Sequence, residues 1–215
     1  MKFSLFRSWG FVIVLLANST YAHHPLNLSI AKENVENYYE CGQYDKDLNK
    51  LIDRAIKHFS KISATDNKAV IFDIDDTMLD DYCNEKHVDF GYIPELFHEW
   101  IMSANLTAIP QTKRLYDYLR KRGFHIIIIT GRSFEEYNAT VKNLKEQGYT
   151  GWDQLILRNA QEKKLTAQAY KSARRLQLIK EGYHIIGSVG DQWSDHEGGN
   201  AGYVVKLPNF RYVLN

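Results

Sequence analysis

The sequence predicts an α/β fold in which a parallel sheet carries helices on both faces. From residue 68 onward, short apolar runs without alternation indicate strands that are buried on both faces. These runs are residues 69–72 (AVIF), 126–129 (IIII), 155–157 (LIL), 185–189 (IIGSV) and 203–205 (YVV). Helical patterns lie between them, and strands that alternate with helices form parallel sheets with right-handed crossovers.

Three helices are predicted between these strands. The first starts near Pro110 and stops at Gly123, so it has a proline at its start and a glycine past its end. The second opens with a capping box at residues 133–136 (SFEE) and stops near Gly148. The third covers about residues 167–181. With the strands, they predict a layered sheet-and-helix architecture.

Two further segments lie outside this alternation. In the polar N-terminal segment, residues 23–66, apolar residues recur at helical spacing over 45–62 and predict one amphipathic helix. Residues 80–109 stand between the first and second strands and contain a predicted helix from Pro94 to about Ala104. We expect this insert to lie over the sheet edge as a small, partly helical cap.

Residues 1–22 have the layout of a secretory signal peptide. Lys2 and Arg7 form a positive start, residues 9–17 form a short apolar core, and Ala22 is a small residue at the expected cleavage point. A membrane-spanning helix is the alternative, but it needs about 20 apolar residues, and this run is about half as long. We therefore expect an exported chain, periplasmic or secreted, without stable membrane insertion.

Charge and cysteine content narrow the class of protein further. The 215 residues include 27 Lys and Arg and 26 Asp and Glu, which gives a formal net charge of +1. A nucleic-acid-binding protein usually has a clear basic excess, so no nucleic-acid partner is expected. Cys41 and Cys83 could form one bridge in an oxidising compartment, which we favour over two separate thiols, although sequence does not fix pairing geometry.

Carboxylates follow the first apolar run, at the edge where parallel sheets bind ligands. Asp73, Asp75 and Asp76 come directly after it, and buried carboxylates are costly unless they are paired or bind a metal. Residues 73 and 75 share a face of an extended segment. One carboxylate can therefore attack a substrate while the other handles protons.

Complementary groups follow the other runs. Thr130 and Gly131 follow the second run, where a hydroxyl and an open backbone suit an anionic oxygen. Asp191 follows the fourth run and could join Asp73 around a hard divalent cation. Lys171 offers a positive charge for a phosphate. Each has a plainer explanation as a helix cap, a turn or a solvated lysine, but together they bring acid, hydroxyl and cation to one edge.

These residues resemble the four ordered motifs of the haloacid dehalogenase superfamily of phosphohydrolases. The motifs are residues 73–77 (DIDDT), Thr130, Lys171 and residues 190–195 (GDQWSD). Together with residues 205–210 (VKLPNF), they are similar to the acid phosphatase subfamily, which includes bacterial class B and class C acid phosphatases and plant vegetative storage proteins. The resemblance implies a Rossmann-like, haloacid dehalogenase-like catalytic domain over residues 67–215.

The resemblance also implies a role for each site residue. Asp73 would be the nucleophile that forms an aspartyl-phosphate. Asp75 would be the acid for the leaving alcohol and then the base for water. Thr130 and the Gly131 amide would hold phosphate oxygens, and Lys171 would neutralise charge on Asp73 and on the transferred group. These roles fit phosphoryl transfer, which needs chiefly positioning and charge stabilisation.

The implied cofactor is one Mg²⁺. It would be held by the Asp73 carboxylate, the Asp75 carbonyl and Asp191, with Asp195 supporting or joining. The implied function is that of an exported, Mg²⁺-dependent acid phosphatase that hydrolyses phosphomonoesters. Relatives are commonly oligomeric, so a homo-oligomer is an expected partner.

Two alternatives stay open. A storage or binding protein could keep this fold with little turnover, although the intact Asp73, Asp75 and Lys171 argue against it. A dehalogenase needs no acid to protonate an alcohol, so Asp75 disfavours that activity. The aromatic insert and Trp193 could stack a nucleoside or aryl leaving group, although such aromatic residues often pack in a core.

Overall fold

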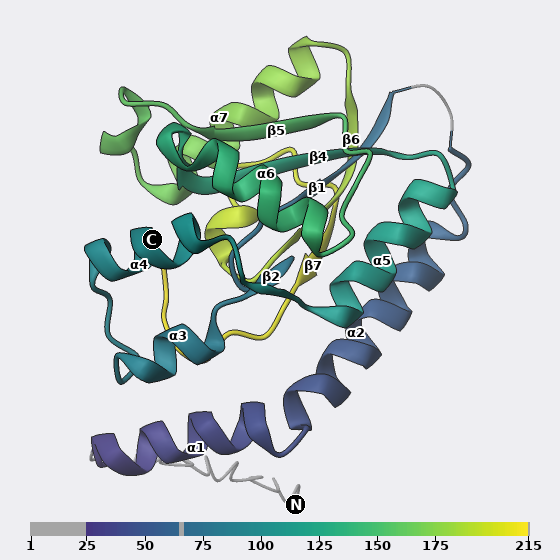
Figure 1. Ribbon diagram of the computed structural model, residues 1–215. Helices are drawn as coiled ribbons and strands as arrows, with labels where there is room; N and C mark the ends of the chain where they lie inside the picture. Colours follow the sequence, from purple (N-terminus) through teal and green to yellow (C-terminus); the bar gives the residue numbers. More distant parts are fainter. Residues whose placement is uncertain (1–24, 65–66, 215) are drawn as a thin grey trace, which may run out of the picture.

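The computed structural model describes residues 25–64 and 67–214, and its centre is a five-stranded parallel sheet (Figure 1). The strand order is β5-β4-β1-β6-β7. The strands are β1 (Lys68–Phe72), β4 (His125–Ser133), β5 (Gln154–Arg158), β6 (His184–Gly190) and β7 (Tyr203–Lys206). Each predicted apolar run lies within one of these strands, so the predicted fold class is confirmed.

Helices cover both faces of the sheet. The helix α7 (Ala167–Lys180) packs on one face through Tyr170 and Leu178. The other face carries α2 (Gln43–Phe59), α5 (Pro110–Lys121) and α6 (Tyr137–Glu146). Successive side chains of a strand point to opposite faces of the sheet. Ile71 of β1 therefore packs in the core beneath α7, and Phe72 packs in the core beneath α2, α5 and α6.

The predicted helix boundaries are close to the observed ones. The capping box at Ser133 is present, since the Ser133 amide donates to Glu136 Oε2 at 2.7 Å. It opens a short 3-10 turn, Phe134–Glu136, that leads into α6. At the start of α7, Thr166 Oγ1 accepts a hydrogen bond from the Ala169 amide at 3.2 Å, which satisfies one of the free donors of the first turn.

The N-terminal segment contains two helices where the sequence predicted one. The additional helix is α1 (Leu28–Glu40), which precedes α2 and has no buried residue. It lies beside α3 (Tyr82–His87) of the insert (Figure 1), and the Tyr82 hydroxyl donates to Glu40 Oε1 at 2.8 Å. This contact ties the start of the described chain to the insert.

The insert between β1 and β4 is partly helical, as predicted. It begins and ends with a short antiparallel pair, β2 (Leu79–Asp80) and β3 (Thr107–Ala108). Between them lie α3 and α4 (Pro94–Ser103), and α4 matches the helix predicted from Pro94. The α4 helix packs against α6 and the 3-10 turn that precedes α6, so the insert reaches the carboxyl edge of β4.

The favoured disulfide is wrong, because Cys41 and Cys83 are both free and exposed. Cys41 lies directly after α1 and its sulfur is 3.9 Å from Asn37 Oδ1 of the same helix. Cys83 lies in the first turn of α3. Neither sulfur forms a disulfide in this structure.

The predicted signal peptide, residues 1–22, lies outside the described residues. Within residues 25–64 and 67–214, no helix combines the length and the apolar character needed to cross a membrane.

Candidate active site

A rigid turn carries the carboxylates that follow β1. The Asp73 amide donates to the Val189 carbonyl at 3.0 Å, so the end of β1 stays paired with β6. The Ile74 carbonyl then accepts the amides of the three residues 77–79 at 2.7–3.1 Å. Asp76 adopts a left-handed φ of 55°, a conformation that costs energy for a residue other than glycine. The turn is therefore held by its own backbone bonds.

Lys171 forms the central ion pair of the site. Its Nζ lies 2.6 Å from Asp73 Oδ1 and also contacts Asp195 Oδ1. All three side chains are buried. Burial works against the positive charge, but Asp195 and Asp73 outweigh it and raise the pKa of Lys171 above its ordinary value. Lys171 is therefore a fixed cation at the carboxyl edge of β1.

Three buried carboxylates gather around this lysine. Asp73, Asp191 and Asp195 each offer an oxygen within 4.8 Å of the others. The Thr77 hydroxyl lies between two of them, 3.4 Å from Asp73 Oδ2 and 3.3 Å from Asp191 Oδ1. Burial, together with Asp195, raises the pKa of Asp191 to about 7. Three carboxylates against one ammonium leave excess negative charge.

This donor set fits a hard divalent cation. Mg²⁺ prefers carboxylate oxygens and is commonly held by one or two carboxylates with other oxygen ligands. Asp195 is the least available of the three, because its Oδ2 accepts the Gln192 amide at 2.9 Å while its Oδ1 contacts Lys171. Gly190 lets Asp195 approach this closely, since a side chain at Gly190 would overlap the Asp195 carboxylate.

Asp75 engages a different cation. Arg132 Nε lies 3.0 and 3.2 Å from the two Asp75 oxygens, and Arg132 Nη2 lies 2.6 Å from Oδ1. The guanidinium is fully buried, and its Nη1 donates to Thr140 Oγ1 of α6 at 3.1 Å. Asp75 is therefore fixed beside the end of β4, and its carboxylate is not part of the cluster formed by Asp73, Asp191 and Asp195.

Thr130 and Gly131 lie in the last part of β4, which is longer than the apolar run predicted. Thr130 is buried, and its Oγ1 accepts the Arg132 amide at 3.1 Å. Gly131 is exposed, with open space where a side chain would stand. The peptide at this position can therefore be approached closely by an anion.

Arg175 is a residue of the site that sequence reasoning missed. It is fully buried on α7, one turn after Lys171, and donates to the carbonyls of Asp195 at 2.6 Å and Gly199 at 2.9 Å. It thus binds the loop that follows β6 to the helix that carries Lys171. The i, i+4 spacing from Lys171 was the available signal, because it places both side chains on one helix face.

The C-terminal strap, defined here as residues 207–214, was also missed. It begins where the Leu207 amide donates to the Gly190 carbonyl at 2.8 Å. Asn209 Nδ2 donates to Asp191 Oδ2 at 2.7 Å. The Tyr212 hydroxyl donates to Asp76 Oδ2 at 2.7 Å and lies 3.4 Å from Asp191 Oδ2. The strap therefore contacts both loops that carry the acidic cluster.

Arg211 anchors the strap in the interior. Its guanidinium contacts Asp76, lies 2.9 Å from Glu85 Oε2 of α3, and stands 4.7 Å from the centre of the Tyr39 ring. Only 1% of its side chain is exposed. Burial and Asp76 raise the pKa of Glu85 to about 9 in spite of Arg211. One guanidinium thus joins the strap, the β1 turn and the insert.

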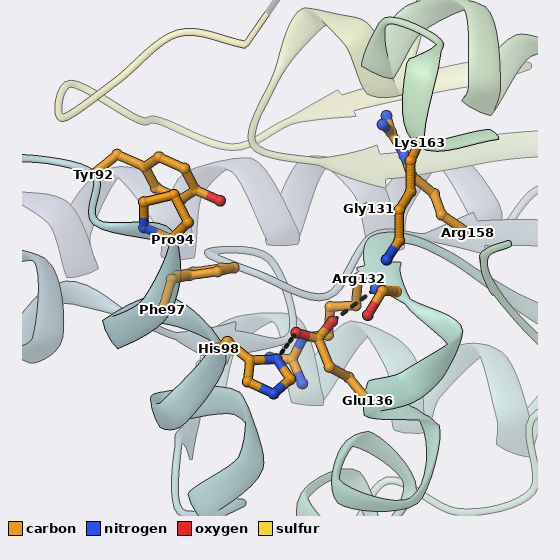
Figure 2. A pocket seen from close by; sticks show the side chains of 10 residues that line it. Tyr92, Pro94, Phe97, His98, Gly131, Arg132, Glu136, Arg158 and Lys163 are labelled. Carbon is orange, nitrogen blue, oxygen red and sulfur yellow. Dashed lines mark hydrogen bonds and ion pairs between the residues drawn. The ribbon is translucent and has the colours of Figure 1, made fainter. Parts of the chain in front are cut away.

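A cavity of about 210 Å³ opens beside Gly131 and Arg132. Figure 2 shows the aromatic residues Tyr92 and Phe97 of the insert on one side, and Arg158 and Lys163 on the other. His98 of α4 closes the lower edge through a 2.8 Å contact with Glu136. Arg158 also went unnoticed in the sequence, although it directly follows the third apolar run.

The chain is similar in sequence to known acid phosphatases and to plant storage proteins. The family described as HAD superfamily, subfamily IIIB (acid phosphatase) matches residues 16–214. Acid phosphatase 1 of Solanum lycopersicum is 30% identical over 213 residues, which cover 96% of this chain and 82% of that protein. Vegetative storage protein 1 of Arabidopsis thaliana is 37% identical over 193 residues, which cover 85% of this chain and 70% of that protein.

A solved structure has the same fold. The class C acid phosphatase from Bacillus anthracis with tungstate bound superposes with a TM-score of 0.69 at 20% identity, over 86% of this chain and 85% of that one. The sequence matches and the carboxylate edge of the sheet lead to one assignment. The chain belongs to the acid phosphatase family, subfamily IIIB of the HAD superfamily.

Proposed function

We propose that the chain is an exported, Mg²⁺-dependent phosphatase that hydrolyses phosphomonoesters through an aspartyl-phosphate on Asp73. The observation that carries the proposal is the buried contact of 2.6 Å between Asp73 and Lys171 beside two further carboxylates. A carboxylate is a usable nucleophile without an activating base. The ammonium offsets the charge of Asp73 as the phosphoryl group approaches.

In the first step, an Asp73 oxygen forms a bond to phosphorus, and the bond from phosphorus to the alcohol oxygen breaks. Asp75 gives a proton to that oxygen, so the leaving group departs as a neutral alcohol. In the second step, Asp75 takes a proton from water, and the water oxygen forms a bond to phosphorus while the bond from phosphorus to the Asp73 oxygen breaks. Inorganic phosphate leaves, and the Asp73 carboxylate is restored. The Thr130 hydroxyl and Gly131 amide hold the phosphate oxygens during both steps.

The contacts of Asp75 are compatible with this role. A carboxylate has about four acceptor positions, and Arg132 directs two nitrogens at Asp75, with Nε shared between both oxygens. The carboxylate therefore keeps acceptor capacity for the proton that is transferred. Arg132 therefore acts as a positioning residue that fixes Asp75 while it works.

Mg²⁺ is proposed to be held by the Asp73 carboxylate, the Asp75 carbonyl and Asp191, with Asp195 supporting or joining. When bound, it supplies positive charge that stabilises the phosphate oxygens in the transition state. The acidic cluster of Asp73, Asp191 and Asp195 supports this assignment. Export to the periplasm or the exterior is proposed from the layout of residues 1–22.

A storage protein with little turnover is the second candidate, because Vegetative storage protein 1 is among the relatives. The buried Asp73–Lys171 pair favours the enzyme, since a storage role needs no costly cluster of buried charges. The two candidates differ in turnover, which a direct assay measures.

The test is release of phosphate from a chromogenic aryl phosphate between about pH 4 and pH 8, with Mg²⁺ or with EDTA. Asp73→Asn should lower the rate by at least about a thousandfold. The matched control is Asp117→Asn, since Asp117 is an exposed carboxylate on α5 whose change should leave the rate within about twofold. Mass spectrometry of the acid-quenched enzyme should find phosphate on the peptide that contains Asp73. Absence of metal-dependent turnover throughout this range would leave the storage role.

A further inference from the structure

The cavity beside Gly131 has one aromatic side and one basic side. Tyr92 and Phe97 come from the insert, with ring centres 5.7 Å apart. Arg158 is the last residue of β5, and its register partner on β4 is Ser133, so it lies at the same carboxyl edge as the phosphate-handling residues. Lys163 belongs to a 3-10 turn, Glu162–Lys164, that follows β5.

Most charges in this cavity are already matched. Arg132 is paired with Asp75, and His98 contacts Glu136 at 2.8 Å. Arg158 and Lys163 differ from them. Among the described residues, Arg158 donates only to the Leu165 carbonyl, at 3.2 Å, and its buried Nε has no partner. Lys163 faces Glu135 at 3.5 Å with both side chains at least half exposed, a contact of little strength.

The aromatic side offers its ring faces to a planar group. Tyr92 is exposed and lines the cavity together with Phe97. Arg132 lines the same cavity, and its Nη2 donates to Asp75 Oδ1 at 2.6 Å. A ring stacked on Tyr92 and Phe97 would therefore share the cavity with the arginine that holds Asp75, the proposed proton donor to the leaving oxygen.

We propose that this cavity binds the leaving group, and that its preferred substrate is a phosphomonoester with a planar ring and a second anionic group. The ring packs against Tyr92 and Phe97, and the second anion, a carboxylate or another phosphate, binds Arg158 and Lys163. The proposal rests on the proposed phosphatase function, because it concerns the part of the substrate that leaves. A guanidinium with free N–H groups suits either oxyanion.

The test compares two substrates that differ in one charge, 4-carboxyphenyl phosphate and its methyl ester. The ratio of their kcat/KM values measures recognition of the second anion, and any loss of catalysis common to both cancels. In Arg158→Gln and in Lys163→Gln, the ratio should shift against the charged substrate by about threefold to tenfold. Lys164→Gln is the matched control, because Lys164 is an exposed neighbour that does not line the cavity, and it should keep the wild-type ratio.

The outcomes separate the two proposals. If neither aryl phosphate is hydrolysed, the proposed function fails. If both are hydrolysed and the ratio of kcat/KM values is the same in all variants, the second-anion site is refuted. In that case, an equal fall in kcat/KM for both substrates in Arg158→Gln assigns Arg158 to the transferred phosphate or to folding. A second arm measures how strongly adenosine 3′,5′-bisphosphate and adenosine 5′-monophosphate inhibit hydrolysis of the methyl ester substrate. If the bisphosphate inhibits more strongly than the monophosphate, and Arg158→Gln removes this difference, phosphate is an accepted second anion. If the two nucleotides inhibit equally while the carboxylate substrate is still preferred over its methyl ester, the site accepts carboxylate alone.

Discussion

Replacement of Arg211 by methionine should destabilise the protein more than loss of an ordinary ion pair. The guanidinium contacts Asp76 and lies 2.9 Å from Glu85 Oε2, and the exposed fractions of the three side chains are 1%, 1% and 12%. Methionine keeps much of the packing volume against Tyr39 but removes the charge. A buried carboxylate is then left without its cation.

The magnitude follows from which carboxylate is affected. Burial and Asp76 raise the pKa of Glu85 to about 9, so Glu85 carries a proton at neutral pH and Asp76 is the group that loses its partner. Removal of one member of a buried pair costs about 3–5 kcal/mol. Asp76 keeps the Tyr212 hydroxyl at 2.7 Å and the Asp81 amide at 3.2 Å, so we expect a loss near 3 kcal/mol. For a chain of this size, that corresponds to a fall in Tm of about 6–12 °C.

The assay is urea unfolding at neutral pH followed by tryptophan fluorescence. Arg114→Met is the matched control, because Arg114 forms a 2.6 Å pair with Asp53 in which both side chains are largely exposed, a pair worth about 1 kcal/mol or less. A loss no larger than that of Arg114→Met would refute the reasoning.

Three further outcomes are expected. Tyr212→Phe removes a hydroxyl that lies 3.4 Å from Asp191, so the Mg²⁺ concentration that gives half-maximal thermal stabilisation should rise by about tenfold; an unchanged midpoint would show that the hydroxyl does not support the site. Glu85 has its pKa raised from 4.5 to about 9 in the folded state. The unfolded chain therefore releases a proton that the native chain keeps as pH rises between these values, which lowers stability. Glu85→Gln mimics the protonated form, so its free energy of unfolding relative to wild type should increase from about pH 5 to pH 9, and parallel curves would contradict the assignment. Thiol titration under denaturing, non-reducing conditions should find two free thiols, Cys41 and Cys83. A titration that finds no free thiol would show that the two cysteines form a disulfide.

The parts of the fold that were predictable are those that bury a continuous apolar surface. The strand at residues 126–129 is covered on both faces, so its four consecutive isoleucines identify it without knowledge of its neighbours. In contrast, no residue of α1 is fully buried. Its apolar residues Ala31, Val35, Tyr38 and Tyr39 recur at helical spacing but are only half-buried, so this short stripe within a polar segment was missed.

The candidate site was predictable where a polar residue ends an apolar run. Asp73 and Asp191 stand out for this reason. Arg175 and Arg211 do not, because an arginine on a helix or in a tail is usually solvated and only the folded chain shows it buried. The Tyr212–Asp76 contact joins positions 136 residues apart, a separation at which no local pattern operates. Arg158 directly follows the apolar run at residues 155–157, as Asp73 follows the run at residues 69–72, so the same pattern could have identified it.

The position of the strap in the chain sets when the protein can first act. Synthesis proceeds from the N-terminus, and domains fold as units while the chain is made. The sheet residues and Lys171 are therefore available before Asn209, Arg211 and Tyr212, which complete the supports of Asp76 and Asp191. A nascent chain that stops before residue 209 would lack these supports on both loops. We expect such a chain to hydrolyse phosphate esters poorly.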